Sequence, residues 1–223
     1  MKMKIVQSIR TFLEEVSEKY NTNTVQKYGD ILDLFKDYLV SYGELSYKED
    51  KNGELILTAD TSELGFGHVS NFLEWFLIRK VIGPQWMLKA APTIIKKYFK
   101  WLDQKGLLAA GMMEEVLDTA KQAAKDLPRV DQAAELLFKV CRINSTKFRD
   151  KDFDDDDYME GYAEVTGILD DKLHLDYEGK KIGPIQITKE IAKYLKKDDT
   201  VNLVVGRIGK KWVPLEVGNV YPG

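Results

Sequence analysis

The feature that most constrains the fold of this chain is a change in its hydrophobic period. In residues 5–141, apolar side chains recur every three or four positions, which is the spacing of amphipathic helices. From Tyr158 onward they alternate with polar residues, as in half-buried β-strands. The sequence therefore predicts an α+β protein: an all-α bundle of four or more helices at 1–141, an acidic linker at 142–157 and a small β-barrel at 158–223.

The first two helices are predicted at 5–20 and 24–42. The segment NTNT at 21–24 ends the first helix and caps the second, because Asn and Thr side chains accept hydrogen bonds from free first-turn amides. The second helix is predicted to end at Gly43. Its apolar residues form a single stripe of Val25, Tyr28, Leu32, Phe35, Leu39 and Tyr42.

Residues 44–67 interrupt the helical pattern. The turn signal Lys51-Asn52-Gly53 lies between short alternating runs and predicts a β-hairpin or an extended loop inserted into the helical domain. The proline and glycine positions then divide the rest of the domain, with a stop at Gly106. The helices predicted from this pattern are 69–81, 85–90 and 93–105, and residues 111–126 and 129–141 give one or two more helices, divided at Pro128.

The C-terminal region contains short alternating runs with turn residues between them. Asp170-Asp171 and Gly209-Lys210 lie where hairpin turns are expected, and residues 187–197 predict a short helix. About 65 residues in short strands favour a closed or half-closed barrel of OB or SH3 type. At least four strands are predicted, around 163–169, 173–177, 201–205 and 213–217.

Composition limits the kinds of function that this chain can have. The formal net charge is -3, from 33 basic and 36 acidic residues, so nucleic-acid binding requires local basic patches. The single Cys141 excludes an internal disulfide and a multi-cysteine zinc site, and it fits a reducing compartment. No apolar run approaches the ~20 residues of a membrane span, and the first residues lack the apolar core of a signal peptide. We expect a cytoplasmic protein without a cofactor and without a membrane partner.

Four segments of the helical half carry a resemblance to a known family. A helix ends near FLEEV, and the next has Thr24, Tyr28 and Phe35 at four- and seven-residue steps. A third helix contains NFLEWFL, and a last, Thr-initiated one reads TIIKKYFKWLDQKGLL. In this order and spacing, residues 5–108 resemble the N-terminal SAM-like core-binding domain of phage integrases and other tyrosine recombinases. The loop at 44–67 is longer than the family usually has.

The resemblance implies a domain that grips one side of duplex DNA with its second and fourth helices. By position, the contacts come from the end of the second helix at 22–27 and from a lysine face on the last helix. Lys89, Lys96 and Lys100 lie at seven- and four-residue steps, and such a row can neutralise phosphates. The break expected at 90–92 separates Lys89 from the helix that carries Lys96 and Lys100. The predicted DNA-binding residues of this domain are Thr24, Lys27, Lys96, Lys97, Lys100 and Lys105.

A second interpretation of these lysines is that they form the solvated side of an amphipathic helix. Residues 1–141 hold 19 basic and 20 acidic groups, a net of -1, so the domain as a whole does not attract DNA. Both interpretations remain open at the level of sequence.

The catalytic set of the recombinase family is missing from this chain. That set includes a His-x-x-Arg motif before a nucleophilic tyrosine, and it stabilises charge on the phosphate. The chain has two histidines, His68 and His174, and neither is followed by Arg at the third position. No other nucleophile–base pair or metal set stands out, so we predict a non-catalytic protein.

Basic residues also gather in the C-terminal domain. Arg207, Lys210 and Lys211 surround the predicted hairpin turn and adjoin Trp212. A basic hairpin with an aromatic side chain can grip nucleic acid. In the alternative interpretation, Trp212 covers the mouth of the barrel and the lysines keep an edge strand soluble.

The acidic run from Asp150 to Asp157 does not fit a calcium loop. Counted from Asp150, the sixth position is Asp155 rather than Gly, and the twelfth is Gly161 rather than Glu. A flexible charged linker explains it better, and we hypothesise that it competes with DNA for the lysine face. Elsewhere, His68 is predicted to be a helix cap or surface residue, and Cys141 a buried apolar one.

Taken together, the sequence predicts a non-catalytic DNA-binding protein whose partner is duplex DNA. The barrel adds a second contact or binds a protein partner. The alternative is a protein-interaction or structural module that uses the same helical fold without nucleic acid.

Overall fold

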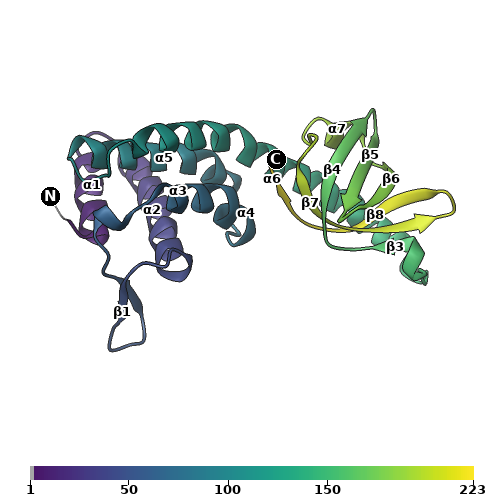
Figure 1. Ribbon diagram of the computed structural model, residues 1–223, viewed down its shortest axis with the longest axis horizontal. Helices are drawn as coiled ribbons and strands as arrows, with labels where there is room; N and C mark the ends of the chain where they lie inside the picture. Colours follow the sequence, from purple (N-terminus) through teal and green to yellow (C-terminus); the bar gives the residue numbers. More distant parts are fainter. Residues whose placement is uncertain (1–2) are drawn as a thin grey trace. The chain divides into compact units, whose positions relative to one another are not determined.

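The computed structural model describes residues 3–223 (Figure 1). The chain divides into two compact units, and the division between Lys125 and Asp126 falls inside one long helix. The first unit is helical, and the second is a β-barrel accompanied by the C-terminal part of that helix. The α+β prediction is therefore confirmed. The boundary predicted at residue 141 lies within the long helix.

The first unit begins with two amphipathic helices joined by a short turn. Asn21 caps the second helix by accepting a hydrogen bond from the Thr24 amide at 3.0 Å, so that helix starts at Thr22. The helical elements, with one π-helical turn (η2), are α1 (Ile5–Ser17), α2 (Thr22–Tyr42), α3 (Phe66–Asn71), η2 (Phe72–Phe76), α4 (Leu77–Arg79), α5 (Gln85–Gln104) and α6 (Met112–Lys147).

Two proline positions were expected to end helices, and both expectations are wrong. Pro92 lies inside α5 and Pro128 inside α6, so the pairs of helices predicted on either side of each are single helices. A proline inside a helix removes one hydrogen bond and costs about 3 kcal/mol. Buried apolar neighbours on both sides, such as Ala91 and Ile94, offset that cost. One consequence is that α5 starts at Gln85 and Thr93 lies in its interior.

The core of the helical unit is rich in aromatic rings. Phe35 packs edge-on against Phe72 with ring centroids 5.0 Å apart, and both side chains are fully buried. Tyr98 is also fully buried, and its hydroxyl lies 2.6 Å from the Ser8 hydroxyl. This core fixes α1, α2 and α5 against one another.

The end of α5 follows the sequence prediction. Gly106 has a φ of 66°, which favours glycine, and its amide donates to the Asp103 carbonyl at 2.9 Å. The Leu107 amide donates to the Leu102 carbonyl at the same distance. These two bonds are the Schellman pattern of a helix C-terminus.

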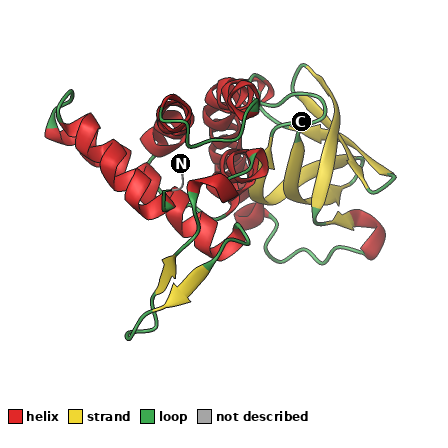
Figure 2. Ribbon diagram, turned by 60° about the vertical axis from the view of Figure 1, so that its left-hand side comes forward, coloured by secondary structure: helices red, strands yellow, loops and turns green. Residues whose placement is uncertain are grey.

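The insertion at 44–67 contains the predicted hairpin. Strands β1 (Tyr47–Glu49) and β2 (Leu55–Leu57) pair antiparallel, and a short 3-10 turn, η1 (Thr61–Glu63), follows. Figure 2 shows the two strands standing out from the helices.

The second unit contains a closed barrel. Its strands pair in the order β4-β5-β6-β8-β7, and β7 pairs with β4 to close the circle. Every pair is antiparallel except β6 with β8. The barrel elements are β4 (Tyr162–Leu169), β5 (Lys172–Tyr177), β6 (Lys180–Gln186), α7 (Lys189–Ala192), β7 (Thr200–Ile208) and β8 (Lys211–Tyr221). A five-stranded barrel of this order, with its helix between the third and fourth strands, has OB topology.

The C-terminal part of α6 is attached to this barrel by polar contacts. Arg129 forms an ion pair with buried Asp199 at 2.6 Å and another with buried Asp126 at 3.0 Å. Further along, the Asn144 side-chain amide donates to the Pro214 carbonyl at 2.8 Å. Ionic groups this deeply buried are tolerated because each has a partner.

The flexible linker predicted at 142–157 is largely structured. Helix α6 continues to Lys147, and Asp155–Asp157 form a 3-10 turn, η3. The next two residues, β3 (Tyr158–Met159), pair with β7. Side-chain bonds from Asn144 and Asp157 to the barrel, and the strand pairing that follows directly, hold a segment whose composition alone predicts flexibility.

Candidate nucleic-acid interface

Because α5 runs through Pro92 without a break, its exposed polar residues form one continuous row. They recur every three or four positions, and the one acidic residue exposed on this helix, Asp103, lies next to Gln104 at the C-terminal end of the row. The row, called the α5 stripe below, consists of the half-buried Trp86 and the exposed Lys89, Thr93, Lys97, Lys100 and Gln104. From Lys89 to Lys100 it covers about 16 Å at the helical rise of 1.5 Å per residue. Lys96 lies beside it, half-exposed.

Lys97 is the most constrained lysine of the stripe. Its ammonium group donates to the hydroxyl of Tyr28 at 2.7 Å and to that of Tyr20 at 3.3 Å. The two tyrosine rings stack on each other with centroids 5.9 Å apart. The Tyr28 hydroxyl raises the pKa of Lys97, since it favours the charged form. The result is a fixed positive charge with one N–H left to donate.

A cavity of about 190 Å³ opens beside Lys97 between α1, α2 and α5. It has three lysines on its wall and one carboxylate, Glu15. Glu15 accepts from Lys105 at 2.9 Å and from the Trp101 indole at 3.0 Å, and these groups lower its pKa. The cavity, called the Lys97 pocket below, is lined by Phe12, Glu15, Val16, Lys19, Tyr20, Tyr28, Lys97, Lys100, Trp101 and Gln104.

The structure brings together most, but not all, of the residues predicted to bind DNA in this domain. Lys27 at the start of α2 lies over the Trp86 ring, 5.4 Å from its centroid, so it adjoins the α5 stripe. Lys96 and Lys100 lie on or beside the stripe. Thr24 is half-buried, and its amide is occupied by Asn21. Lys105 is neutralised by Glu15 and lies 5.4 Å from the Trp101 centroid.

Three residues of this interface escaped the sequence prediction. Lys19 and Tyr20 follow the end of α1 and had no periodic pattern to mark them. Tyr28 was assigned to the apolar stripe of α2, and its ring is indeed buried while its hydroxyl reaches Lys97. A tyrosine with one apolar and one polar end fits both roles, and only the position of α5 distinguishes them.

The basic residues of the barrel lie at the hairpin between β7 and β8. Gly209 makes the turn with a φ of 62°, and Lys210 and Lys211 are exposed beside it. Arg207 pairs across the strands with Trp212 and lies 5.8 Å from its ring centroid. This turn joins the fourth and fifth strands of the barrel, and the corresponding loop of OB folds is used in binding oligonucleotides.

Two features distinguish this hairpin from the α5 stripe. Trp212 is 8% exposed and the Arg207 guanidinium lies over its ring, so the ring is covered and is not available for stacking on a base. The guanidinium of Arg207 donates through Nε and Nη2 to one oxygen of Asp157. The hairpin therefore has two exposed lysines and one arginine that an acidic partner already occupies.

Other residues with reactive side chains have structural roles. The Nδ1 of His68 accepts from the Gly65 amide at 2.8 Å, and its Nε2 lies 3.0 Å from the Gly43 carbonyl. His68 is thus a cap at the start of α3. Burial raises the pKa of Cys141 to about 12, so its thiol is an inert core group. Among residues 3–223, no cluster of His, Cys, Asp and Glu is placed to hold a metal ion.

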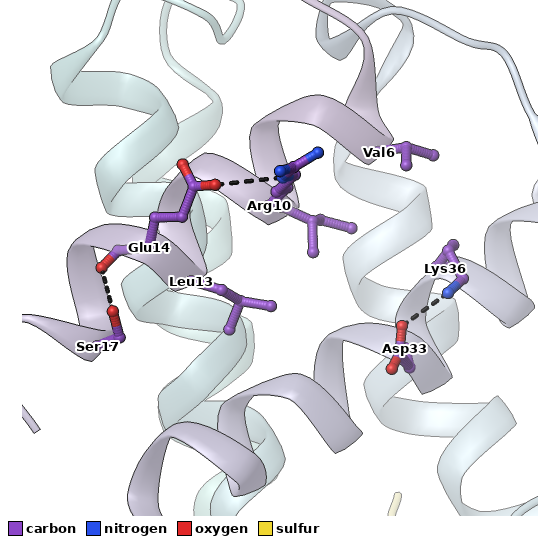
Figure 3. Close-up of a pocket in the computed structure, with 8 residues that line it drawn as sticks. Val6, Arg10, Leu13, Glu14, Ser17, Asp33 and Lys36 are labelled. Carbon is purple, nitrogen blue, oxygen red and sulfur yellow. Dashed lines mark hydrogen bonds and ion pairs between the residues drawn. The ribbon is translucent and has the colours of Figure 1, made fainter. Parts of the chain in front are cut away.

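A second groove in the helical unit differs from the Lys97 pocket in its electrostatics. It has a volume of about 410 Å³, lies between α1 and α2, and has Val6, Ile9 and Leu13 on its wall (Figure 3). Its charged groups pair with each other, Arg10 with Glu14 at 3.2 Å and Lys36 with Asp33 at 2.6 Å. Because these charges cancel, the groove offers no net attraction to phosphate.

Comparisons with protein-family models, with curated proteins and with solved structures give no match. Within the part of the chain that the structure describes, no helix is long and apolar enough to cross a membrane.

Proposed function

We propose that this protein is a non-catalytic DNA-binding protein that holds duplex DNA through the α5 stripe and the Lys97 pocket. The observation that carries the proposal is a row of exposed lysines, Lys89, Lys97 and Lys100, on one uninterrupted helix whose single acidic residue, Asp103, follows them near the C-terminal end. Its central lysine is held in place by two tyrosine hydroxyls. The relationship to the core-binding domain of tyrosine recombinases belongs to the same proposal, since the second and last helices of the resemblance supply these residues.

The physical basis of the proposal is counterion release. Each phosphate that a lysine neutralises adds about −0.9 to the slope of log affinity against log salt. Lys19, Lys89, Lys96, Lys97 and Lys100 are the candidates, so we expect a slope of roughly −3 to −5. The stretch from Lys89 to Lys100 spans about five base pairs at 3.4 Å each. Contacts of this kind position a protein on DNA without reading its sequence.

The tyrosine hydroxyls strengthen the proposal in a specific way. A free surface lysine loses side-chain entropy when it binds a phosphate, and this loss weakens the contact. Lys97 is already restrained by Tyr20 and Tyr28, so less entropy remains to be lost. The barrel hairpin, through Lys210 and Lys211, would provide a second contact to the nucleic acid.

The proposal can be tested by fluorescence anisotropy with a labelled generic duplex at several salt concentrations. We expect binding that weakens steeply with salt, and near-complete loss of binding in the triple variant Lys96→Glu, Lys97→Glu, Lys100→Glu. A matched control is Lys48→Glu, Lys51→Glu, Lys121→Glu, which makes the same charge change at exposed positions away from the stripe. An equal loss in both variants would show a nonspecific charge effect and contradict the proposed interface.

The alternative function is a protein-interaction module. The groove between α1 and α2, with its apolar wall and self-paired charges, is the observation that favours it. No binding of the duplex at about 50 mM salt, where phosphate contacts are strong, would overturn the DNA-binding proposal in favour of this one.

A further inference from the structure

The segment that leads into the barrel is attached to strand β7 beside the basic hairpin. Tyr158 pairs with Gly206, and Met159 pairs with Val205. A side chain at position 206 would overlap the Phe153 ring, so the glycine gives Phe153 room to pack against the strand. Phe153 also contacts Tyr158, with ring centroids 6.2 Å apart. Residues 153–159 are called the acidic strap below.

The strap places one carboxylate against the hairpin. Of its four aspartates, Asp154, Asp155 and Asp156 are exposed, whereas Asp157 is half-buried and bonded to the Arg207 guanidinium. Gly206, on which Phe153 packs, is the immediate neighbour of Arg207. The packing of the strap and the ion pair are therefore coupled: the anchor at Phe153 and β3 holds Asp157 within reach of Arg207.

We propose that the acidic strap masks Arg207 and that a nucleic-acid phosphate competes with Asp157 for this arginine. The proposal rests on the proposed function, because it assigns a regulation to the barrel's share of the same binding activity. The sequence led us to expect that the acidic run competes with DNA for the lysines of the helical domain. In this proposal its Asp157 competes with DNA for Arg207 of the barrel.

The geometry makes Arg207 a suitable phosphate ligand. Both of its bonds to Asp157 go to a single carboxylate oxygen, so the guanidinium fork is not matched by a second acceptor. A phosphate can accept both N–H groups on separate oxygens, and such paired contacts are the stronger ones. The Trp212 ring under Arg207 would keep the guanidinium in place during the exchange.

The strength of the masking follows from exposure. The side chains of Arg207 and Asp157 are 43% and 27% exposed, so water screens their ion pair. A pair of this kind holds its arginine weakly enough for a phosphate to displace the carboxylate. Removing the carboxylate should then raise nucleic-acid affinity by roughly two- to fivefold.

The test uses the full-length chain and a single substitution, Asp157→Asn. This change keeps the size of the side chain and removes its charge. The matched control is Asp156→Asn, which makes the same charge change one residue away at an exposed position. Anisotropy with a labelled duplex and with a labelled oligothymidylate should show the increase for Asp157→Asn and a smaller or no increase for Asp156→Asn. Thermal unfolding monitors whether the strap and barrel stay folded.

The arginine is tested by repeating both measurements in an Arg207→Gln background. If the Asp157 carboxylate acts by occupying Arg207, Asp157→Asn should not raise nucleic-acid affinity in the Arg207→Gln background. The proposal would be overturned if Asp156→Asn and Asp157→Asn raised affinity equally, or if the increase persisted in the Arg207→Gln background. Either result would mean that the strap weakens binding only by general charge repulsion.

The outcomes separate this inference from the proposed function. If the wild-type protein binds DNA and Asp157→Asn has no effect, the masking proposal fails and the DNA-binding proposal stands. If neither the wild type nor Asp157→Asn binds either probe at about 50 mM salt, the DNA-binding proposal fails and the masking proposal fails with it.

Discussion

The Lys97 pocket and the β7–β8 hairpin present similar cations in opposite chemical surroundings. Lys97 is held by two neutral hydroxyl groups, which restrain the ammonium and leave its charge intact. Arg207 is held by a carboxylate, which restrains the guanidinium and cancels its charge. Both residues count as exposed. The partner of a surface cation, more than its exposure, therefore decides whether the cation is available to a phosphate.

The largest expected effect is on the stability of the barrel unit. Arg129→Gln leaves Asp199 buried without its cation, while Asp126 keeps the Lys196 ammonium at 3.3 Å, and breaking a buried pair costs about 3–5 kcal/mol. We expect amides of β7 to lose hydrogen-exchange protection while amides of α5 keep theirs, and duplex binding through the helical unit to survive. An equal loss of hydrogen-exchange protection in β7 and in α5 would contradict the expectation that the barrel unit can be destabilised without the helical unit.

A second change gives Lys97 the kind of partner that Arg207 has. Tyr20→Glu replaces the hydroxyl that lies 3.3 Å from the ammonium by a carboxylate on the same side of Lys97. Because a hydrogen bond to a charged group is worth about 1.5–3 kcal/mol, we expect duplex affinity to fall at least about tenfold. The control is Tyr47→Glu, at an exposed tyrosine of the β1–β2 hairpin. Unchanged affinity in Tyr20→Glu would remove Lys97 from the interface.

A smaller effect is expected when the hydroxyl is removed without adding charge. Tyr28→Phe deletes the 2.7 Å bond to Lys97 and keeps the ring in its buried position. Because this bond positions Lys97 and does not itself contact the DNA, we expect only part of its roughly 1.5–3 kcal/mol to be lost from binding, which weakens duplex binding roughly fivefold. The salt slope should stay the same, because the number of charges does not change. A shallower slope would mean that the hydroxyl does more than position the lysine.

The smallest effect concerns Glu15, the carboxylate of the Lys97 pocket. The Lys105 ammonium and the Trp101 indole lower its pKa, so this interaction contributes stability above the unfolded pKa of about 4.3 and loses it as the pH falls through the lower folded value. We expect Glu15→Gln to destabilise the protein by less than about 1 kcal/mol at pH 7. Urea unfolding should show this difference shrinking below about pH 4. A difference that persists at low pH would assign the effect to packing.

Much of the fold follows from local patterns in the sequence. The three- to four-residue period marks α1 and α2, and Gly106 marks the end of α5 because its positive φ is a local backbone requirement. The β1–β2 turn and the turn at Gly209 are equally local. These features depend on neighbours a few positions away, so a single sequence is enough to locate them.

The errors in the fold prediction arise where distant contacts override local preference. Pro92 and Pro128 favour helix ends, but the burial of residues on both sides keeps each helix continuous. Strand β6 was not among the predicted strands because Gly183 and Pro184 interrupt its alternation, yet it pairs with both β5 and β8 and closes the barrel. The choice between OB and SH3 topology depended on that pairing.

The sequence by itself determined which cations exist, the helices and strands on which they lie, and the absence of the recombinase catalytic motif. Only the tertiary structure decided how each cation is engaged: Lys97 by tyrosines, Lys105 by Glu15 and Arg207 by Asp157. The reason is physical. A helix or strand is specified by neighbouring residues, whereas the electrostatic environment of a side chain is set by groups tens of residues away that folding brings within a few ångströms.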